Sequence, residues 1–242
     1  MINDPLSLSI ALLAVAFGSA LQSLTGIGIA IVAAPILVLI DAAFLPAPIL
    51  ALGCALSLLN TLRYRQTLHF GNTRVALCGR IPGVLLGIPL LTLLPQSFLM
   101  IGFAVLIIIS VALSYHHITL HQTRTNLAIA GFFSGVMGTT TSVGGPPIAL
   151  VYQNSAPDQA RAELGLYFLT GTLMSLILLG FSGNITSTQV QLTLQMSPAL
   201  LAGFFLSFWL DRYFKVSHLK PVIALMSLSS SAVILCRTLA QL

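Results

Sequence analysis

Ten apolar runs fill this chain almost from end to end, and they constrain its fold more than any other feature. A helix that crosses the hydrocarbon core of a bilayer needs roughly 20 apolar residues. The runs are continuous, whereas strands of a transmembrane barrel would alternate apolar and polar residues. Charged residues make up only 6% of the 242 residues, against roughly 25% in a soluble domain. The pattern predicts an all-α polytopic integral membrane protein and excludes a soluble enzyme, a nucleic-acid binder and a disordered chain.

The apolar runs form two similar sets of five. The expected segments are 6–24, 27–40, 42–62, 75–94 and 98–115 in the first half, and 127–137, 145–152, 162–181, 190–210 and 219–239 in the second half. At a constant offset Gly26 matches Gly138, and further proline, glycine and asparagine positions match along the two halves. Such matches in the same segment order indicate a duplication. We therefore expect two transmembrane repeats, 1–125 and 126–242, within one transmembrane domain.

The charges of the loops orient the two repeats. The loop 63–74 carries three arginines, whereas the equivalent loop 182–189 carries no charge. The reverse holds for the next pair, because 95–97 is uncharged and 211–220 carries one arginine and two lysines. Lysine and arginine concentrate in cytoplasmic loops, so equivalent loops should lie on opposite sides. We therefore expect an inverted repeat in a bacterial-type inner (plasma) membrane, with both termini on the non-cytoplasmic side.

The second segment of each repeat is too short to cross a bilayer comfortably. The runs 27–40 and 145–152 therefore predict broken or re-entrant helix pairs that meet inside the membrane near 25–28 and 138–147. Backbone groups freed at a break cannot face lipid, and helix N-termini favour anions. The candidate substrate-binding residues are Gln22, Thr25, Gly26, Gly28, Asn60, Gly138, Thr139, Thr140, Thr141, Ser142, Gly144, Gly145 and Pro146.

Close helix packing is the alternative explanation for small residues in membrane helices. We prefer packing for five glycines that lie inside the apolar runs: Gly18, Gly83, Gly87, Gly131 and Gly203. For the run 139–145, which two prolines follow, packing alone is a poor explanation and a ligand site is the preferred one.

Charged residues near the segment ends have two interpretations each. Three arginines are candidates to attract an anion to the cytoplasmic mouth: Arg63, Arg80 and Arg161. For Arg80 and Arg161 a cytoplasmic anchor that snorkels to the interface is the preferred alternative. Three acidic residues are candidates for proton coupling, although a solvated helix end is preferred for each: Asp41, Asp158 and Glu163.

Catalytic and metal-binding motifs are missing from the sequence. The five histidines fall in expected loops without the spacing of a metal site: His69, His116, His117, His121 and His218. The three cysteines lack a CxxC spacing, and no phosphate-binding loop occurs. The sequence therefore predicts no catalytic residue, no metal and no cofactor, and the protein is not expected to be an enzyme.

Two motifs resemble those of the TauE/SafE family, the sulfite exporter-like membrane proteins. The first is Phe17–Gly28 (FGSALQSLTGIG) followed by Pro35, and the second is Gly131–Gly138 (GFFSGVMG) continuing to Gly144–Pro147 (GGPP). The resemblance extends over nearly the whole chain, including its size and duplication. It implies transport of sulfur-containing anions such as sulfite, sulfonates or sulfoacetate.

The leading hypothesis is a secondary transporter or permease for a small anion, which works by alternating access at the two broken-helix motifs. Besides the anionic substrate and the lipid bilayer, the candidate partners are a proton or sodium ion as coupling ion and a second copy of the chain in a homodimer. A nucleic-acid partner is not expected. A passive anion channel is the main alternative, and a membrane-embedded enzyme or assembly factor is a weaker one.

Overall fold

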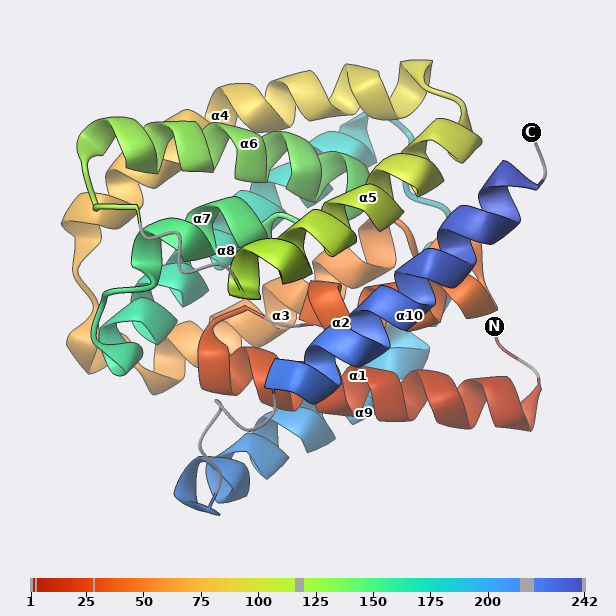
Figure 1. The fold of residues 1–242 in the computed structure, drawn as a ribbon, viewed down its shortest axis with the longest axis horizontal. Coiled ribbons are helices and arrows are strands. Elements are labelled where there is room, and N and C mark those ends of the chain that lie inside the picture. Colours follow the sequence, from red (N-terminus) through yellow and green to blue (C-terminus); the bar gives the residue numbers. More distant parts are fainter. Residues whose placement is uncertain (1, 3, 28, 116–119, 214–219, 241–242) are drawn as a thin grey trace.

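The chain folds into ten α-helices and two short 3-10 helices, with no strand among the residues that the structure describes (Figure 1). The computed structural model describes residues 2, 4–27, 29–115, 120–213 and 220–240. The helices are α1 (Pro5–Thr25), α2 (Ile29–Ile40), η1 (Ala42–Phe44), α3 (Ala47–Arg63), η2 (Arg65–Thr67), α4 (Phe70–Leu93), α5 (Gln96–Tyr115), α6 (Arg124–Thr141), α7 (Gly145–Tyr152), α8 (Pro157–Phe181), α9 (Ser187–Tyr213) and α10 (Lys220–Leu239).

The predicted all-helical fold is confirmed, and every expected segment corresponds to one α-helix. Among the residues that the structure describes, four helices are long and apolar enough to cross a membrane, by length and composition: α1, α4, α8 and α9. Shorter apolar helices accompany them, including α2 and α3. Several helices extend beyond their predicted ends, and among them α6 continues to Thr141 and α8 already begins at Pro157. Both extensions change the interpretation of site residues below.

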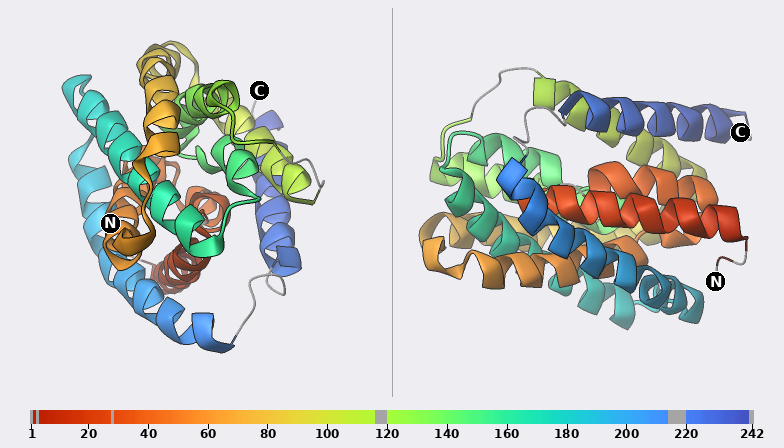
Figure 2. Two further views of the ribbon diagram at one scale, coloured as in Figure 1. Left: turned by 90° about the vertical axis from the view of Figure 1, so that its left-hand side faces the viewer. Right: turned by 90° about the horizontal axis from the view of Figure 1, so that it is seen from below.

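Helices from the two halves of the sequence pack against each other. In the centre α3 lies against α8, and α5 pairs with α10 (Figures 1 and 2). The helix α4 packs on α6 and α8, and the helix α9 packs in the corresponding way on α1 and α3. The two halves therefore interlock and do not form separate bundles.

Glycines at the helix crossings allow this close packing. A methyl carbon at Gly83 of α4 or Gly131 of α6 would collide with the backbone of the facing helix, and the same holds for Gly203 of α9 against α1. A methyl carbon at Gly87 would lie 2.9 Å from Thr139 Cβ, and one at Gly18 would lie 3.2 Å from a side chain of α2. The packing interpretation of these five glycines is confirmed.

The loops that carry the basic residues meet at one end of the molecule. Hydrogen bonds join them there: Thr67 Oγ1 donates to Asp158 O (3.1 Å), Asn72 Nδ2 to Gln122 Oε1 (2.9 Å), and Gln122 Nε2 to Ser155 Oγ (2.6 Å). The start of α1 and the end of α10 both lie at the opposite end of the molecule (Figure 1, and Figure 2, right). The basic loops thus share one end, and its assignment to the cytoplasm stays a prediction.

Candidate functional site

A cavity lies between the two helix interruptions. At the first, α1 ends with Gly26 in the left-handed conformation (φ 83°), and α2 begins at Ile29. At the second, α6 ends with Ser142 at φ 62°, and α7 begins at Gly145. The cavity is lined by Gln22, Ile27, Ile29, Ala30, Ile31, Ile49, Leu50, Gly53, Ser57, Arg80, Gly138, Ser142, Gly144, Gly145, Phe168 and Thr172.

At the first interruption, the buried side chain of Gln22 joins three helices. Its Oε1 accepts a hydrogen bond from the backbone N–H of Ile29 at 3.2 Å, and its Nε2 donates to Ser57 Oγ at 3.4 Å. The first bond satisfies one of the backbone N–H groups that a helix N-terminus leaves unpaired. Gln22 therefore links the first interruption to α3, and the N-terminus of α2 offers one donor fewer to a ligand.

Serine hydroxyls fix the second interruption. Ser134 Oγ of α6 donates to the backbone oxygen of Gly144 at 2.5 Å, and Ser142 Oγ donates to Pro46 O at 2.9 Å. The helix α7 carries prolines in its first turn, and proline has no backbone N–H. The N-terminus of α7 therefore holds fewer anion-binding donors than the sequence interpretation assumed. A positive side chain nearby would add to what the remaining backbone donors offer an anion.

Arg80 of α4 supplies that positive charge. Its side chain is 1% exposed, it lines the cavity, and the interpretation as a snorkelling anchor is therefore wrong. The Nη1 group donates to Ser134 Oγ at 3.4 Å, and the guanidinium lies over the Tyr167 ring at 4.8 Å. The Nε group has no hydrogen-bond partner, and Arg80 forms no ion pair with the described residues. A buried guanidinium thus faces the cavity without a counter-charge.

Small residues around Arg80 make room for this guanidinium. A methyl carbon at Gly138 would lie 3.3 Å from Arg80 Nη2 and 3.5 Å from the Cα atom of Gly144. A methyl carbon at Gly171 of α8 would collide with Nε, Cδ and Cζ of Arg80. Glycine at these positions therefore leaves the space in which Arg80 reaches the second interruption.

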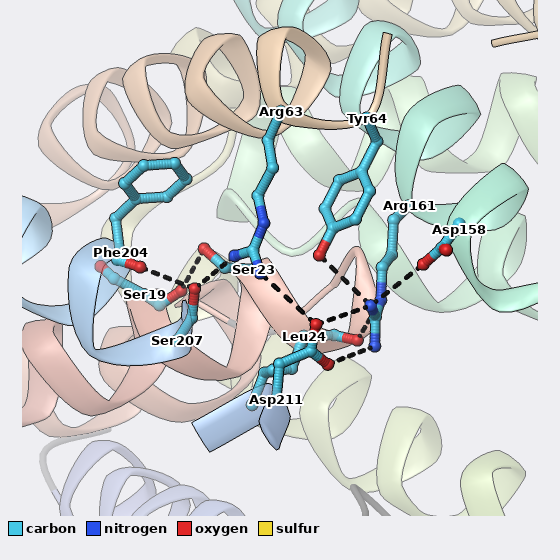
Figure 3. A network of polar contacts seen from close by, with 10 residues as sticks. All are labelled: Ser19, Ser23, Leu24, Arg63, Tyr64, Asp158, Arg161, Phe204, Ser207 and Asp211. Atoms are coloured by element: carbon cyan, nitrogen blue, oxygen red, sulfur yellow. Dashed lines mark hydrogen bonds and ion pairs between the residues drawn. The ribbon is translucent and has the colours of Figure 1, made fainter. Parts of the chain in front are cut away.

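The other two predicted arginines do not line the cavity. Figure 3 shows Arg63 and Arg161 in a polar network with Asp211 of α9. Arg63 Nη2 lies 3.4 Å from Asp211 Oδ2, and Arg161 Nη2 lies 3.2 Å from Asp211 Oδ1. Arg161 also pairs with Asp158 at 3.2 Å, and its Nε donates to Leu24 O at 2.6 Å.

This polar network, formed by Arg63, Tyr64, Asp158, Arg161 and Asp211, holds α1, α3, α8 and α9 together. Arg161 Nη1 donates to the Tyr64 hydroxyl at 3.2 Å, and Arg63 stacks over a ring of α9 at 3.8 Å. Burial raises the pKa of Tyr64, although the nearby Arg161 and Arg63 act in the opposite direction. The phenol therefore stays neutral at physiological pH and serves as an acceptor for Arg161.

Several predicted site residues lie beside the cavity without lining it. Thr139, Thr140 and Thr141 belong to the last turn of α6, and the hydroxyls of the latter two donate to backbone oxygens of their own helix. Thr139 exchanges a hydrogen bond with Ser175 Oγ at 2.9 Å. Thr25, Gly26, Asn60 and Pro146 are also absent from the lining of this cavity. Gly28, like His116, His117 and His218, lies outside the described residues.

The three acidic candidates have different surroundings. Asp41 is exposed and caps η1 through Ala43, and the Asp158 side chain is 61% exposed, as a solvated helix end predicts. Glu163 is 0% exposed, so the solvated-end interpretation is wrong for it. The reason is that α8 begins at Pro157, which puts Glu163 in the second turn of the helix and not at its end.

Sequence reasoning missed the contributions of α3 and α8 to the cavity, which are Ile49, Leu50, Gly53 and Ser57 on α3 and Phe168 and Thr172 on α8. It also missed Ser134, which contacts both Arg80 and the second interruption. A serine or threonine inside an apolar run was the available signal. That signal is weak, because hydroxyl groups in membrane helices commonly bond to their own backbone.

Comparison with known proteins identifies the family of the chain. No curated protein and no solved structure matches the chain. The model of one protein family, described as sulfite exporter TauE/SafE, matches residues 10–234. Membership indicates a membrane transporter, in agreement with the apolar helices. Since the match covers nearly the whole chain, this protein belongs to the sulfite exporter TauE/SafE family.

Proposed function

We propose that this protein binds a small sulfur oxyanion, sulfite or a sulfonate, at Arg80 and carries it across the membrane by alternating access. The observation that carries the proposal is the buried guanidinium in the cavity, which has no ion-pair partner among the described residues. Burying an uncompensated charge is costly unless a counter-charge arrives. A bound anion removes that cost, so the cavity is suited to an anion.

The chemistry of the cavity fits a sulfur oxyanion. Guanidinium groups bind oxyanions through parallel N–H donors, and Arg80 Nε, which packs against Gly171, has no hydrogen-bond partner. Gln22 and Ser142 also line the cavity, and their side chains are held by hydrogen bonds to Ser57 and to Pro46 O. Apart from Ser57 and Thr172 the remaining lining is apolar, with Leu50 and Phe168 among its larger side chains. A sulfonate combines these requirements, because it joins an anionic head to an organic group.

The alternating-access part of the proposal rests on how the helices pack. The helix α4 in repeat 1–125 corresponds to α9 in repeat 126–242, and their contacts correspond as well. The contact of α4 with α6 matches that of α9 with α1, and the contact of α4 with α8 matches that of α9 with α3. An inverted repeat would produce this exchange, and transporters of that type rock one part against the other around a central site. We place the two broken-helix motifs at that central site.

The polar network defined above is suited to closing one end of this path. It ties the C-terminal end of α1, next to the first interruption, to α3, α8 and α9. Opening on that side requires these bonds to separate. We assign this end to the cytoplasm of a bacterial-type cell from its basic loops.

Uptake of radiolabelled sulfite by the purified protein in liposomes tests the proposal. The wild-type protein should show saturable uptake, and Arg80→Gln should lose it because the cavity loses its positive charge. Arg74→Gln is the matched control, since Arg74 lies on the same helix but is exposed. Uptake that is equal in Arg80→Gln and wild type contradicts the assignment of Arg80. Flux that depends on Arg80 but never saturates favours the passive channel.

A further inference from the structure

Arg80 and Glu163 are the only charged side chains that are buried in the described part of the chain. Arg80 lines the cavity, whereas Glu163 lies on α8, five positions before the cavity residue Phe168. The anion-binding role proposed above uses Arg80 and leaves Glu163 without a function. A carboxyl group buried in a membrane protein is expensive and is a functional-site hypothesis by default.

The polar partners of Glu163 are neutral. Its Oε2 accepts from the Tyr152 hydroxyl at 2.9 Å, and its Oε1 accepts from Gln159 Nε2 at 2.7 Å. No arginine or histidine nitrogen of the described residues lies within ion-pair distance of this carboxyl. The other ionisable side chains on α8 and on the described elements that pack against α8 or carry Tyr152 are Cys54, Arg63, Arg65, Arg74, Cys78, Arg80, Arg124, Asp158, Arg161 and Tyr167.

This environment accommodates Glu163 with or without a proton. A phenol hydroxyl donates to a carboxylate and equally accepts from a carboxylic acid, and a carboxyl group offers acceptor sites in both states. Tyr152 therefore keeps its hydrogen bond to Glu163 when the proton arrives. Gln159 is partly exposed near the N-terminal end of α8 and connects the carboxyl to the surface. The carboxyl is thus one hydrogen bond away from a partly exposed side chain.

Glu163 is also connected to the cavity. Tyr152 is the last residue of α7, and Gly145, the first residue of the same helix, lines the cavity. Eight helical residues span about 12 Å. A change at the carboxyl therefore acts on a helix whose other end forms the second interruption.

The summed charge of Arg80, Glu163 and any bound anion determines the energy of each state during the conformational change, because the surrounding medium has a low dielectric constant. Without substrate, a positive Arg80 and an ionised Glu163 sum to zero. With a monovalent anion at Arg80, the sum is zero only when Glu163 carries a proton. The anion alone or the proton alone leaves one uncompensated buried charge, which is costly.

Resting on the function proposed above, we propose that Glu163 is the proton-binding site of this transporter and that one proton moves with each monovalent anion. One carboxylate oxygen of Glu163 takes up the proton from the side on which the anion enters. The proton leaves from the same oxygen on the side on which the anion is released. The substrate's own bonds do not change, and no further reactant is needed.

Liposomes that contain the wild-type protein or Glu163→Gln test this inference. Glutamine keeps the size and an acceptor oxygen but cannot take up a proton. The two measurements are equilibrium exchange of labelled sulfite, which needs no net proton movement, and accumulation driven by an imposed pH gradient with the membrane potential clamped at zero. Both proteins face the same protonation states of sulfite, so a difference between them reports on the protein. Asp158→Asn is the matched control, because Asp158 is an exposed carboxylate on the same helix.

We expect wild-type protein and Asp158→Asn to accumulate sulfite up to about tenfold for a gradient of one pH unit. Glu163→Gln should exchange sulfite at the wild-type rate but accumulate none. Accumulation by Glu163→Gln at the wild-type level overturns the proton site, and so does loss of exchange together with accumulation. Absence of exchange in the wild-type protein itself refutes the proposed anion transport and not the proton site specifically.

Infrared spectra of the wild-type protein give a second readout that does not depend on the variant's folding. Sulfite added at constant pH should produce the C=O stretching band of a protonated carboxyl group, because the anion and the proton bind together. The band should be absent when sulfite is added to Arg80→Gln, the variant that is expected not to transport sulfite. A wild-type spectrum without a sulfite-induced carboxyl band overturns the inference.

Discussion

Replacing Gly171 by alanine tests the position of the Arg80 guanidinium without changing its charge. The new methyl carbon would collide with Nε, Cδ and Cζ of Arg80, whereas ordinary contact begins at 3.4 Å. The guanidinium therefore has to retreat by about 1 Å or more. The helix itself should tolerate the change, because alanine is favoured over glycine in a helix by roughly 0.5–1 kcal/mol. The atoms that must move belong to the end of a flexible side chain.

A shift of about 1 Å lengthens a hydrogen bond from about 2.9 Å to a distance at which it no longer forms. A hydrogen bond to a charged group contributes about 1.5–3 kcal/mol, so the affinity for the anion should fall about 10- to 100-fold. The assay is the concentration dependence of sulfite uptake into liposomes. Gly180→Ala is the matched control on α8, since a methyl there meets only Ile185 Cδ1 at 3.8 Å. An unchanged half-saturation concentration in well-folded Gly171→Ala would refute the placement of the anion at Arg80.

Three further predictions concern the second interruption, the polar network and the topology. Gly144→Ala should weaken sulfite uptake about tenfold, because its methyl would lie 2.7 Å from a backbone oxygen of α6; Gly145→Ala meets its nearest atom at 3.4 Å and should transport normally. Asp211→Asn should raise the rate of sulfite exchange roughly fivefold. It should lose little thermal stability, since partly exposed ion pairs contribute about 1 kcal/mol or less. An unchanged exchange rate with a lower melting temperature would contradict a gating role of the polar network. In a background without native cysteines, a cysteine at Gln66 should react only from the cytoplasmic side and one at Thr186 only from the other; labelling from the same side would contradict the inverted repeat.

The number and order of the helices were predictable because each has its own apolar run. Glycine and proline marked the interruptions, since Gly26 adopts a positive φ at the end of α1 and proline opens α7. The helix ends were harder to place. Thr140 and Thr141 looked like part of a break, yet they continue α6, and their hydroxyls bond to oxygens one turn earlier in the same helix and not to a ligand.

The two buried charges could not be placed from the sequence for a different reason. Arg80 reaches the cavity because α4 and α6 cross closely at glycines, and that contact joins residues far apart in the chain. Glu163 is buried because α8 begins earlier than its apolar run and because Tyr152 of α7 covers the carboxyl. Arg63 and Arg161 looked like free cations for the same reason, since their partner Asp211 lies on α9. The local sequence pattern predicts a helix and its apolar face. Which charged side chains remain without a partner depends on tertiary contacts between residues far apart in the chain.

The central claim is that the anion binds at Arg80, and a structure with a heavy analogue of sulfite tests it most directly. Selenite has the same shape and charge as sulfite, and selenium gives an anomalous signal that locates it in a crystal. The account predicts a selenium peak in the cavity with its oxygens within hydrogen-bond distance of Arg80 Nε or Nη2. The protein used should be one for which selenite competes with labelled sulfite. A selenium peak at the Arg63–Arg161–Asp211 network, with no peak in the cavity, would contradict the claim.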